Sequence, residues 1–242
     1  MYLYGIDYTY IIFVLPALIL SLIAQVLVKG RFSRFDKVIN KRNLTGAQAA
    51  QLLLQRHNIY DVKIAHVKGH LSDNYNPSTK ILSLSDSTYS STSIAAIGVA
   101  AHETGHAIQH AAEYGPLGLR KTLVPAANIG SRFGPTLAIL GIIFGGTTKT
   151  SNYLSIFQLI TNIGIILFGL AVLFYIVTLP VEFNASRRAL RILRDTNTLD
   201  KTELKDVKKV LSAAALTYVA SALTAIGSLI RLILLSNRRT RD

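Results

Sequence analysis

The sequence predicts a mainly α-helical membrane protein with three to four transmembrane helices and a small α+β part outside the membrane. Three observations indicate this fold class. Half of the 242 residues are apolar and only 16% are charged, whereas a soluble domain carries about a quarter charged residues. Several apolar runs are long enough to cross a bilayer. The stretch between the first two runs, residues 30–122, instead mixes polar and apolar positions with helical and strand periodicity.

The composition also excludes several classes of protein. An apolar fraction this high is incompatible with disorder. The chain has no cysteine, which excludes disulfides, a thiol nucleophile and any Cys-ligated metal, so a metal site must use His, Asp or Glu. The net charge of +13 is compatible with a protein that binds nucleic acid. The basic residues flank apolar runs, however, so we expect a lipid bilayer as the partner and no nucleic acid.

The first apolar run, residues 9–28, contains no charged residue and can cross a hydrocarbon core of about 30 Å. A cleaved signal peptide is the alternative. No basic residue precedes the run, and the run exceeds the usual apolar region of about 7–15 residues. Residues 1–29 are therefore interpreted as a retained transmembrane anchor.

Charge asymmetry predicts how the chain crosses the membrane. Only Asp7 precedes the anchor, whereas basic residues follow it at Lys29, Arg31, Arg34, Lys37, Lys41 and Arg42. The positive-inside rule then places the N-terminus outside and residues 30–122 in the cytoplasm. Residues 123–179 hold two further apolar runs whose connection carries one basic residue, Lys149, and residues 180–209 carry eight. We expect a transmembrane hairpin over 123–179 and a cytoplasmic helix over 180–209.

The last apolar run, 210–235, is ambiguous. It contains Arg231 and precedes Arg238, Arg239 and Arg241. If it crossed the membrane, this basic tail would lie outside, against the positive-inside rule. The C-terminal segment, residues 210–242, is therefore predicted as an apolar helix that either forms a fourth span or lies against the other helices.

Within residues 30–122, turn and cap signals delimit short elements. Residues 43–45 can cap a helix that continues through Leu54. Residues 62–67 roughly alternate apolar and polar positions, and 81–84 resume an extended pattern after turn formers at 73–79. These patterns predict a short β-hairpin across residues 62–85.

A second helix begins at Thr92 or Ser93 and is expected to end near Tyr114, where Gly115-Pro116 stops it. It contains His-Glu-Thr-Gly-His at 102–106. Two histidines at i and i+4 lie on one helical face and can bind one ion.

Zinc accepts histidine nitrogen at about 2.0–2.1 Å in tetrahedral geometry. Glu103, between His102 and His106, is placed to take a proton from an attacking water, as metal-assisted hydrolysis requires. The alternative is a pair of core histidines beside an incidental acid. Burying an unpaired acid on an apolar helix is costly, which favours the functional interpretation.

A third metal ligand must come from elsewhere in the chain. His110 lies on the same face, but a rise of about 1.5 Å per residue puts its Cα roughly 12 Å from that of His102. The spacing also lacks the glycine that turns the chain in HExxHxxGxxH enzymes. Glu182 is the better candidate, because the 124–179 hairpin returns it to the same membrane face and Pro180 suits the first turn of a helix. The alternative for Glu182 is a carboxylate that favours a helix N-terminus.

Two segments, AAHETGHAIQH at 100–110 and LPVEFNASRRAL at 179–190, resemble the YugP-type neutral zinc metallopeptidases of bacterial membranes. Residues 69–75 and 213–220 resemble further segments of that family, so the similarity covers nearly the whole chain. It implies a gluzincin-like peptidase with a zincin-like domain, one Zn²⁺ on His102, His106 and Glu182, and Glu103 as catalytic base. Gluzincins commonly carry an acid four residues after the ligand glutamate, where this chain has Ser186.

The function predicted from the sequence is that of a membrane-embedded, zinc-dependent endopeptidase whose site faces the cytoplasm. Its substrate is expected to be a membrane-associated protein or peptide, aligned by edge pairing with the strand at 81–84. Further residues are candidates for oxyanion stabilisation or support of the metal ligands: Tyr75, His70, His110 and Asn184. The competing class is a non-catalytic, zinc-stabilised membrane scaffold or adaptor, which would not need Glu103. The sequence indicates no oligomeric state.

Overall fold

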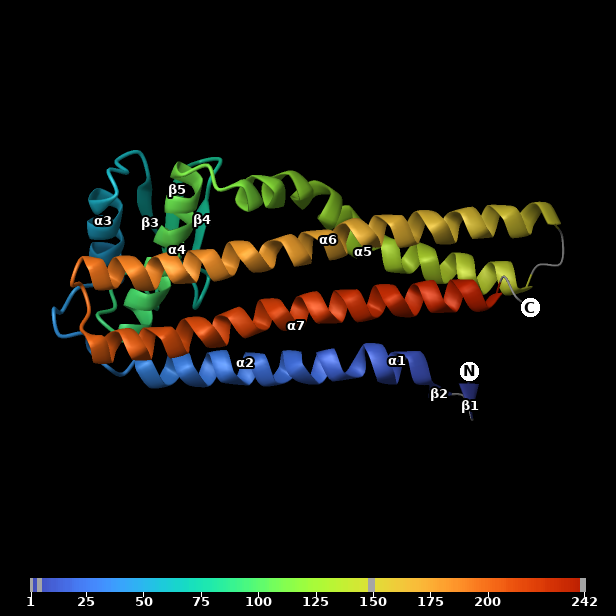
Figure 1. Ribbon diagram of the computed structural model, residues 1–242, viewed down its shortest axis with the longest axis horizontal. Coiled ribbons are helices and arrows are strands. Elements are labelled where there is room, and N and C mark those ends of the chain that lie inside the picture. The colour runs from blue at the N-terminus through green and yellow to red at the C-terminus, as the bar shows by residue number, and fades with distance from the viewer. Residues whose placement is uncertain (1, 4–5, 148–150, 240–242) are drawn as a thin grey trace. The chain divides into compact units, whose positions relative to one another are not determined.

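The computed structural model describes residues 2–3, 6–147 and 151–239 of the chain. The structure is mostly helical, with a small three-stranded sheet (Figure 1). The elements are β1 (Tyr2–Leu3), β2 (Ile6–Asp7), α1 (Tyr8–Phe13), α2 (Leu15–Phe35), α3 (Gly46–Arg56), β3 (Lys63–Val67), β4 (Asn74–Asn76), β5 (Ile81–Ser85), α4 (Ile94–Ala111), α5 (Gly115–Thr147), α6 (Ser151–Asp195) and α7 (Lys201–Arg239).

The chain divides into two compact units, each assembled from separate stretches of sequence. The helical unit comprises residues 1–23, 119–179 and 218–242, and the site unit comprises residues 24–118 and 180–217. The helices α2, α5, α6 and α7 each contribute residues to both units.

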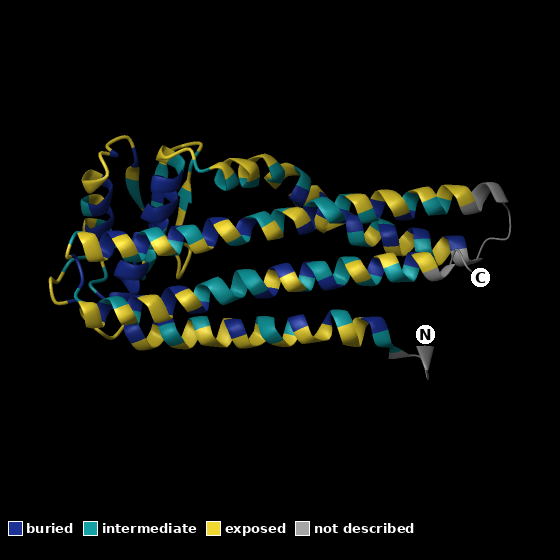
Figure 2. Ribbon diagram, in the orientation of Figure 1, coloured by how far each residue is buried: buried dark blue, intermediate teal, exposed yellow. Residues whose placement is uncertain are grey.

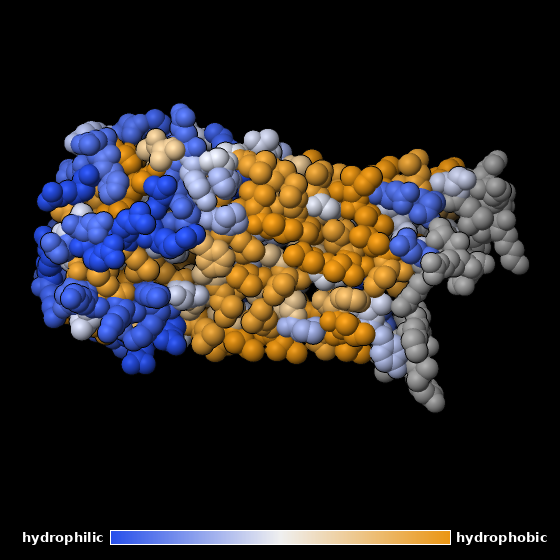
Figure 3. Space-filling model, viewed as in Figure 1, coloured by the Kyte–Doolittle hydropathy of each residue, from blue (hydrophilic) through white to orange (hydrophobic). Residues whose placement is uncertain are grey.

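The helical unit has a largely apolar surface (Figure 3). Among the described residues, four helical stretches are long and apolar enough to cross a membrane: Tyr8–Phe35, Gly115–Gly145, Ser155–Asp195 and Lys201–Asn237. Only 17% of the most apolar window of the first stretch is buried. Apolar side chains cover the visible face of this unit, whereas hydrophilic side chains gather over the site unit (Figure 3). The fold is therefore mostly helical with four candidate membrane-spanning helices, as the apolar runs predicted.

Small residues bring the backbones of α5 and α6 close together in the helical unit. A Cβ atom added at Gly130 would lie 2.0 Å from the carbonyl oxygen of Leu167, and one at Gly134 would lie 2.7 Å from the backbone nitrogen of Phe168. Apolar burial drives little association in a bilayer, because lipid tails are as apolar as the helices. Close backbone approach and the resulting van der Waals contact therefore stabilise this pair.

Arg231, the charge inside the last apolar run, is paired within the helical unit. Its Nε donates to Asp7 Oδ2 at 2.9 Å, and its guanidinium carbon lies 5.6 Å from the centre of the Tyr10 ring. A Cβ atom at Gly227 would lie 2.0 Å from the carbonyl oxygen of Phe13, so α7 packs directly on α1. The ion pair compensates a charge that would otherwise be costly in an apolar segment.

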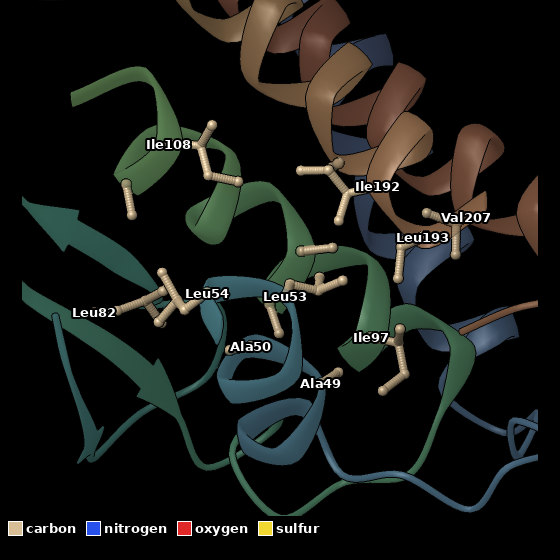
Figure 4. Close-up of a cluster of buried hydrophobic side chains, with 14 of the residues drawn as sticks. Ala49, Ala50, Leu53, Leu54, Leu82, Ile97, Ile108, Ile192, Leu193 and Val207 are labelled. Carbon is tan, nitrogen blue, oxygen red and sulfur yellow. The ribbon is translucent and has the colours of Figure 1, made fainter. Parts of the chain in front are cut away.

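The site unit has its own hydrophobic core, in which α4 is the central element. The helix α3 packs against α4, which also contacts β4 and β5. Most of α4 is buried (Figure 2). The core side chains come from α3, β5, α4, α6 and α7, and include Leu53, Leu54, Leu82, Ile97 and Leu193 (Figure 4). A helix enclosed on several sides can hold its side chains in fixed rotamers, which a metal site requires.

The sheet differs from the predicted hairpin. Its strand order is β3-β5-β4, with β3 parallel to β5 and β4 antiparallel to β5. The prediction of one hairpin across residues 62–85 is therefore wrong, and the hairpin is confined to β4 and β5. The strand at 81–84 is central rather than an edge, so it cannot align a peptide by edge pairing. Alternation of apolar and polar residues predicts a strand but not its direction or partner.

The local signals at the starts of α3 and α4 are confirmed. Thr45 caps α3 and forms a capping box with Gln48, as the predicted start at residues 43–45 requires. Ser93 caps α4 through a hydrogen bond from the backbone N–H of Ala96. The predicted end of α4 near Tyr114 is wrong, because the helix ends at Ala111 and Gly115 begins α5. Proline is tolerated in a first helical turn, so Gly-Pro here marks a start rather than a stop.

Pro180 does not begin a helix. It lies inside α6, which is continuous from Ser151 to Asp195. The expected helix over 180–209 is likewise two elements, because α6 ends at Asp195 and α7 begins at Lys201. A proline removes one backbone hydrogen bond, and tertiary packing can compensate for that loss in a long helix. Glu182 therefore lies in the interior of a helix and caps nothing.

Candidate metal centre

The candidate site lies where α4 crosses α6 within the site unit. The helices meet at Gly105, where an added Cβ atom would lie 2.6 Å from the carbonyl oxygen of Ala185. Any larger residue would force the two backbones apart. Gly105 lies within the 102–106 motif, and Ala185 lies one turn beyond Glu182 on α6. The glycine thus brings the motif close enough to α6 for side chains of both helices to share one site.

The structure brings together His102, His106 and Glu182. Nε2 of His102 lies 3.2 Å from Oε2 of Glu182, and Nε2 of His106 lies 3.5 Å from the same oxygen. The ligand atoms of the three residues all lie within 4.8 Å of one another. Glu182 is 2% exposed and His106 8% exposed. Among the residues that the structure describes, no other group of three or more His, Cys, Asp or Glu could hold a metal ion.

These separations fit a zinc ion. In a tetrahedral site with bonds of about 2.0–2.1 Å, any two ligand atoms stand about 3.3–3.4 Å apart. The two separations that involve Glu182, 3.2 and 3.5 Å, bracket this value, and the ligand nitrogens of the two histidines lie within 4.8 Å of each other. Two histidines and one carboxylate also form a ligand set that catalytic zinc sites use, with the fourth position left for water. The cluster can therefore hold a metal ion, and its donor atoms suit zinc.

The charges around His106 favour a cation at this point. Burial by itself lowers the pKa of His106, but the hydrogen bond to Glu182 and the nearby charge of Glu103 outweigh that effect and raise its pKa above the usual value. The two carboxylates therefore create a negative potential at the imidazole. A bound divalent cation would meet the same potential and would be stabilised by it.

Glu103 lies next to this cluster without a partner of its own. It is 9% exposed, and the structure shows no hydrogen bond or ion pair between its carboxylate and any described residue. A carboxylate that no other side chain engages is available to accept a proton.

Two side chains to which the sequence analysis assigned no role contact the second ring nitrogen, Nδ1, of each histidine. Gln109 Oε1 lies 3.0 Å from Nδ1 of His106, and Ser186 Oγ lies 3.1 Å from Nδ1 of His102. Metal-binding histidines usually engage their second nitrogen in this way. Ser186 occupies the position where gluzincins commonly place an acid. Gln109 could have been found as the polar residue three positions after His106, on the same helical face.

Three of the remaining predicted residues, Tyr75, His110 and His70, make contacts outside the ligand cluster. The hydroxyl of Tyr75 on β4 lies 2.8 Å from Nδ1 of His110, and burial together with the charge of Asp61 raises the pKa of Tyr75 to about 12. Tyr75 is therefore a neutral hydroxyl at ordinary pH. His70 packs edge-on against Phe32, with ring centres 5.2 Å apart. None of the hydrogen bonds, ion pairs or ring contacts that we find for Tyr75, His110 or His70 joins them to the ligand cluster.

Asn184 is held in a hydrogen-bond network on α6. Its side-chain oxygen accepts from Nε2 of Gln109 at 3.0 Å and from Nε of Arg188 at 2.7 Å. Through Gln109 it is linked to His106, so its contacts lie on the side of the histidine that faces away from Glu182.

Comparison with known proteins is consistent with this site. The family described as "Putative neutral zinc metallopeptidase" matches residues 10–237. The chain is 41% identical over 226 residues to "Putative membrane protease YugP" of Bacillus subtilis (strain 168), an alignment that covers 93% of this chain and 96% of the relative. No solved structure matches the chain significantly.

The protein therefore belongs to the family described as "Putative neutral zinc metallopeptidase". The resemblance inferred from segments 100–110 and 179–190 is confirmed at the level of the family.

Proposed function

We propose that the protein is a membrane-embedded, zinc-dependent endopeptidase with its site in the site unit. One observation carries this proposal: a buried cluster of His102, His106 and Glu182 lies beside Glu103, a buried carboxylate on the same helix as the histidines. A purely structural zinc site normally fills all four positions with protein ligands. Three ligands and an unpaired base instead suit hydrolysis.

His102, His106 and Glu182 would hold the zinc ion. When bound, zinc lowers the pKa of a coordinated water towards about 7 and polarises the carbonyl of the scissile bond. Glu103 would take the proton from the attacking water and later give it to the leaving amine, so that one residue acts first as base and then as acid.

The substrate would be an extended segment of a membrane-associated protein or peptide. Because β5 is central in the sheet, the strands available for edge pairing are β3 and β4. Of these, β4 contacts α4, the helix that carries Glu103. A peptide that adds to the free edge of β4 would satisfy its backbone hydrogen bonds there. This replaces the predicted role of residues 81–84.

Removing the metal tests the proposal. The purified protein in detergent should hydrolyse a quenched fluorescent peptide library or unfolded casein. A chelator should abolish this activity, and added Zn²⁺ should restore it. If the zinc-loaded protein binds one ion per chain but cleaves none of these substrates, and its partners are retained on the zinc-loaded form alone, the scaffold or adaptor class is the better description.

For the membrane arrangement we propose four spans, with residues 30–122 and 180–209 on the cytoplasmic side. Residues 227–231 of α7 pack against α1 in the helical unit, and Val210 of α7 packs against Phe32 and Phe35 of α2 in the site unit. The α7 helix therefore contacts the N-terminal anchor near both of the anchor's ends. If the anchor crosses the bilayer, α7 does too, which supports the open alternative of a fourth span for residues 210–235. The Asp7 ion pair lowers the cost of placing Arg231 near the outer surface.

Labelling in intact cells tests this topology. Single cysteines would be introduced at Ser72, in the site unit, and at Thr148, which lies outside the described residues, in the connection between α5 and α6. An impermeant thiol reagent should label the cysteine at 148 and spare the one at 72. The native chain has no cysteine, so no background labelling is expected. Permeabilised cells serve as the control, in which both positions should react. Equal labelling of both positions in intact cells would contradict the arrangement.

A further inference from the structure

Gln109 is a buried polar residue that the proposed chemistry does not use. It lies on α4 and is fully buried. Its Oε1 lies 3.0 Å from Nδ1 of His106, while its Nε2 donates to the carbonyl oxygen of Val181 at 2.8 Å and to Oδ1 of Asn184 at 3.0 Å. Both the oxygen and the nitrogen of this buried amide are therefore engaged in hydrogen bonds.

The direction of each hydrogen bond in this network is determined by its two ends. The carbonyl of Val181 can only accept and Nε of Arg188 can only donate. Because Arg188 donates to Asn184 at 2.7 Å, the oxygen of Asn184 faces both Arg188 and Gln109. The amide nitrogen of Gln109 must therefore face α6, and its oxygen must face His106.

It follows that Nδ1 of His106 donates the hydrogen bond to Gln109 and carries a proton. The lone pair available for a metal is then on Nε2, the atom that lies 3.5 Å from Oε2 of Glu182. Val181 directly precedes Glu182 in the sequence, so the same amide connects the histidine to the backbone beside the third ligand. Ser186 cannot act in this way on His102, because a hydroxyl can either donate or accept.

We propose that Gln109 is a positioning residue that keeps the proton of His106 on Nδ1 and thereby presents Nε2 to the metal. This inference rests on the proposed function of the cluster as a zinc site. Without Gln109, the Nδ1 proton loses its acceptor, whereas a proton on Nε2 would find one in Glu182. The imidazole would then occupy the metal position with its own N–H, and zinc would have to displace that proton.

The test uses the full-length protein in detergent and Zn²⁺ alone, titrated against a chromophoric chelator. Gln109→Met should weaken zinc binding by about 10–100-fold, the range typical of residues that hydrogen-bond metal ligands. Ser186→Ala should cost less. Thr104→Val is the matched control, because Thr104 is equally buried on α4 and its hydroxyl donates only to the carbonyl of Ala100. This control should bind zinc like the wild type. The melting temperature of each variant in chelator reports its folding.

A second readout follows the proton itself. In ¹⁵N-histidine spectra of the metal-free protein, recorded at a pH at which His106 is neutral and with His106 assigned by loss of its signals in His106→Ala, Nδ1 should be protonated in the wild type and lose its proton in Gln109→Met. An unprotonated Nδ1 in the wild type would overturn the inference. This result needs only the wild-type protein, so it holds even if Gln109→Met fails to fold. The inference would also be overturned if Gln109→Met bound zinc as tightly as the wild type. Failure of the zinc site itself is recognised separately, because then His102→Ala would bind zinc no more weakly than the wild type.

Discussion

Glu103→Gln is expected to keep zinc bound while peptide hydrolysis falls by at least about 10²–10⁴-fold, the usual contribution of a general acid–base group. The substitution preserves size and hydrogen bonding but removes the group that accepts the proton of water. The measurement compares the initial rate on the fluorescent peptide with the zinc content of the same preparation. The variant should lose activity but keep its zinc, because Glu103 is not among the three ligands.

Glu113→Gln is the control for this substitution, since Glu113 follows α4 and is exposed. It should cleave at the wild-type rate. If Glu103→Gln also cleaves at that rate, the base lies elsewhere and the mechanism must be redrawn. If Glu103→Gln loses activity and zinc together while Glu113→Gln keeps both, the effect of Glu103 is on folding or metal affinity and not on proton transfer.

Glu182→Ala is expected to lose zinc during purification in the presence of a mild chelator, while His110→Ala retains it. Glu182 faces both histidine nitrogens at 3.2 and 3.5 Å, whereas His110 turns its Nδ1 towards Tyr75 at 2.8 Å. Loss of a direct ligand should cost more affinity than the roughly 10–100-fold of a supporting residue. The measurement is the zinc content of each purified variant.

His102→Ala serves as the positive control for metal loss in this series. Because Glu182 is 2% exposed, the melting temperature of each variant in chelator distinguishes loss of the metal from loss of the fold. If His110→Ala contains no zinc while Glu182→Ala retains it, the proposed ligand set is contradicted. The metal would then have to be bound by three histidines of one helix.

The sequence predicted those features that depend on near neighbours in the chain. The uncharged run at 9–28 indicates a membrane anchor because hydrocarbon excludes charges along its whole length. Thr45 and Ser93 cap helices through hydrogen bonds to backbone groups two or three residues away. The spacing of His102 and His106 brings both onto one face of α4 because a helix repeats every 3.6 residues.

Features that depend on contacts distant in sequence were beyond such reasoning. Glu182 was selected from the expected hairpin, the family resemblance and a helix start at Pro180. The resemblance is confirmed, while the helix start is wrong because packing carries α6 through the proline. The parallel pairing of β3 with β5 and the role of Gln109 also went unpredicted, because pairing direction and side-chain partners depend on which elements meet.

By itself, the sequence determined the membrane class, the helix that carries the motif and the residues able to bind a metal, because composition and periodicity act over one or two helical turns. Only the tertiary structure decided that Gly105 lets α4 approach Ala185 of α6 closely, with Glu182 opposite both histidines. It also decided that Gln109 and Ser186 support those histidines. The reason is physical: a site shared by two helices exists only where their backbones meet, and that crossing is a property of the packed chain.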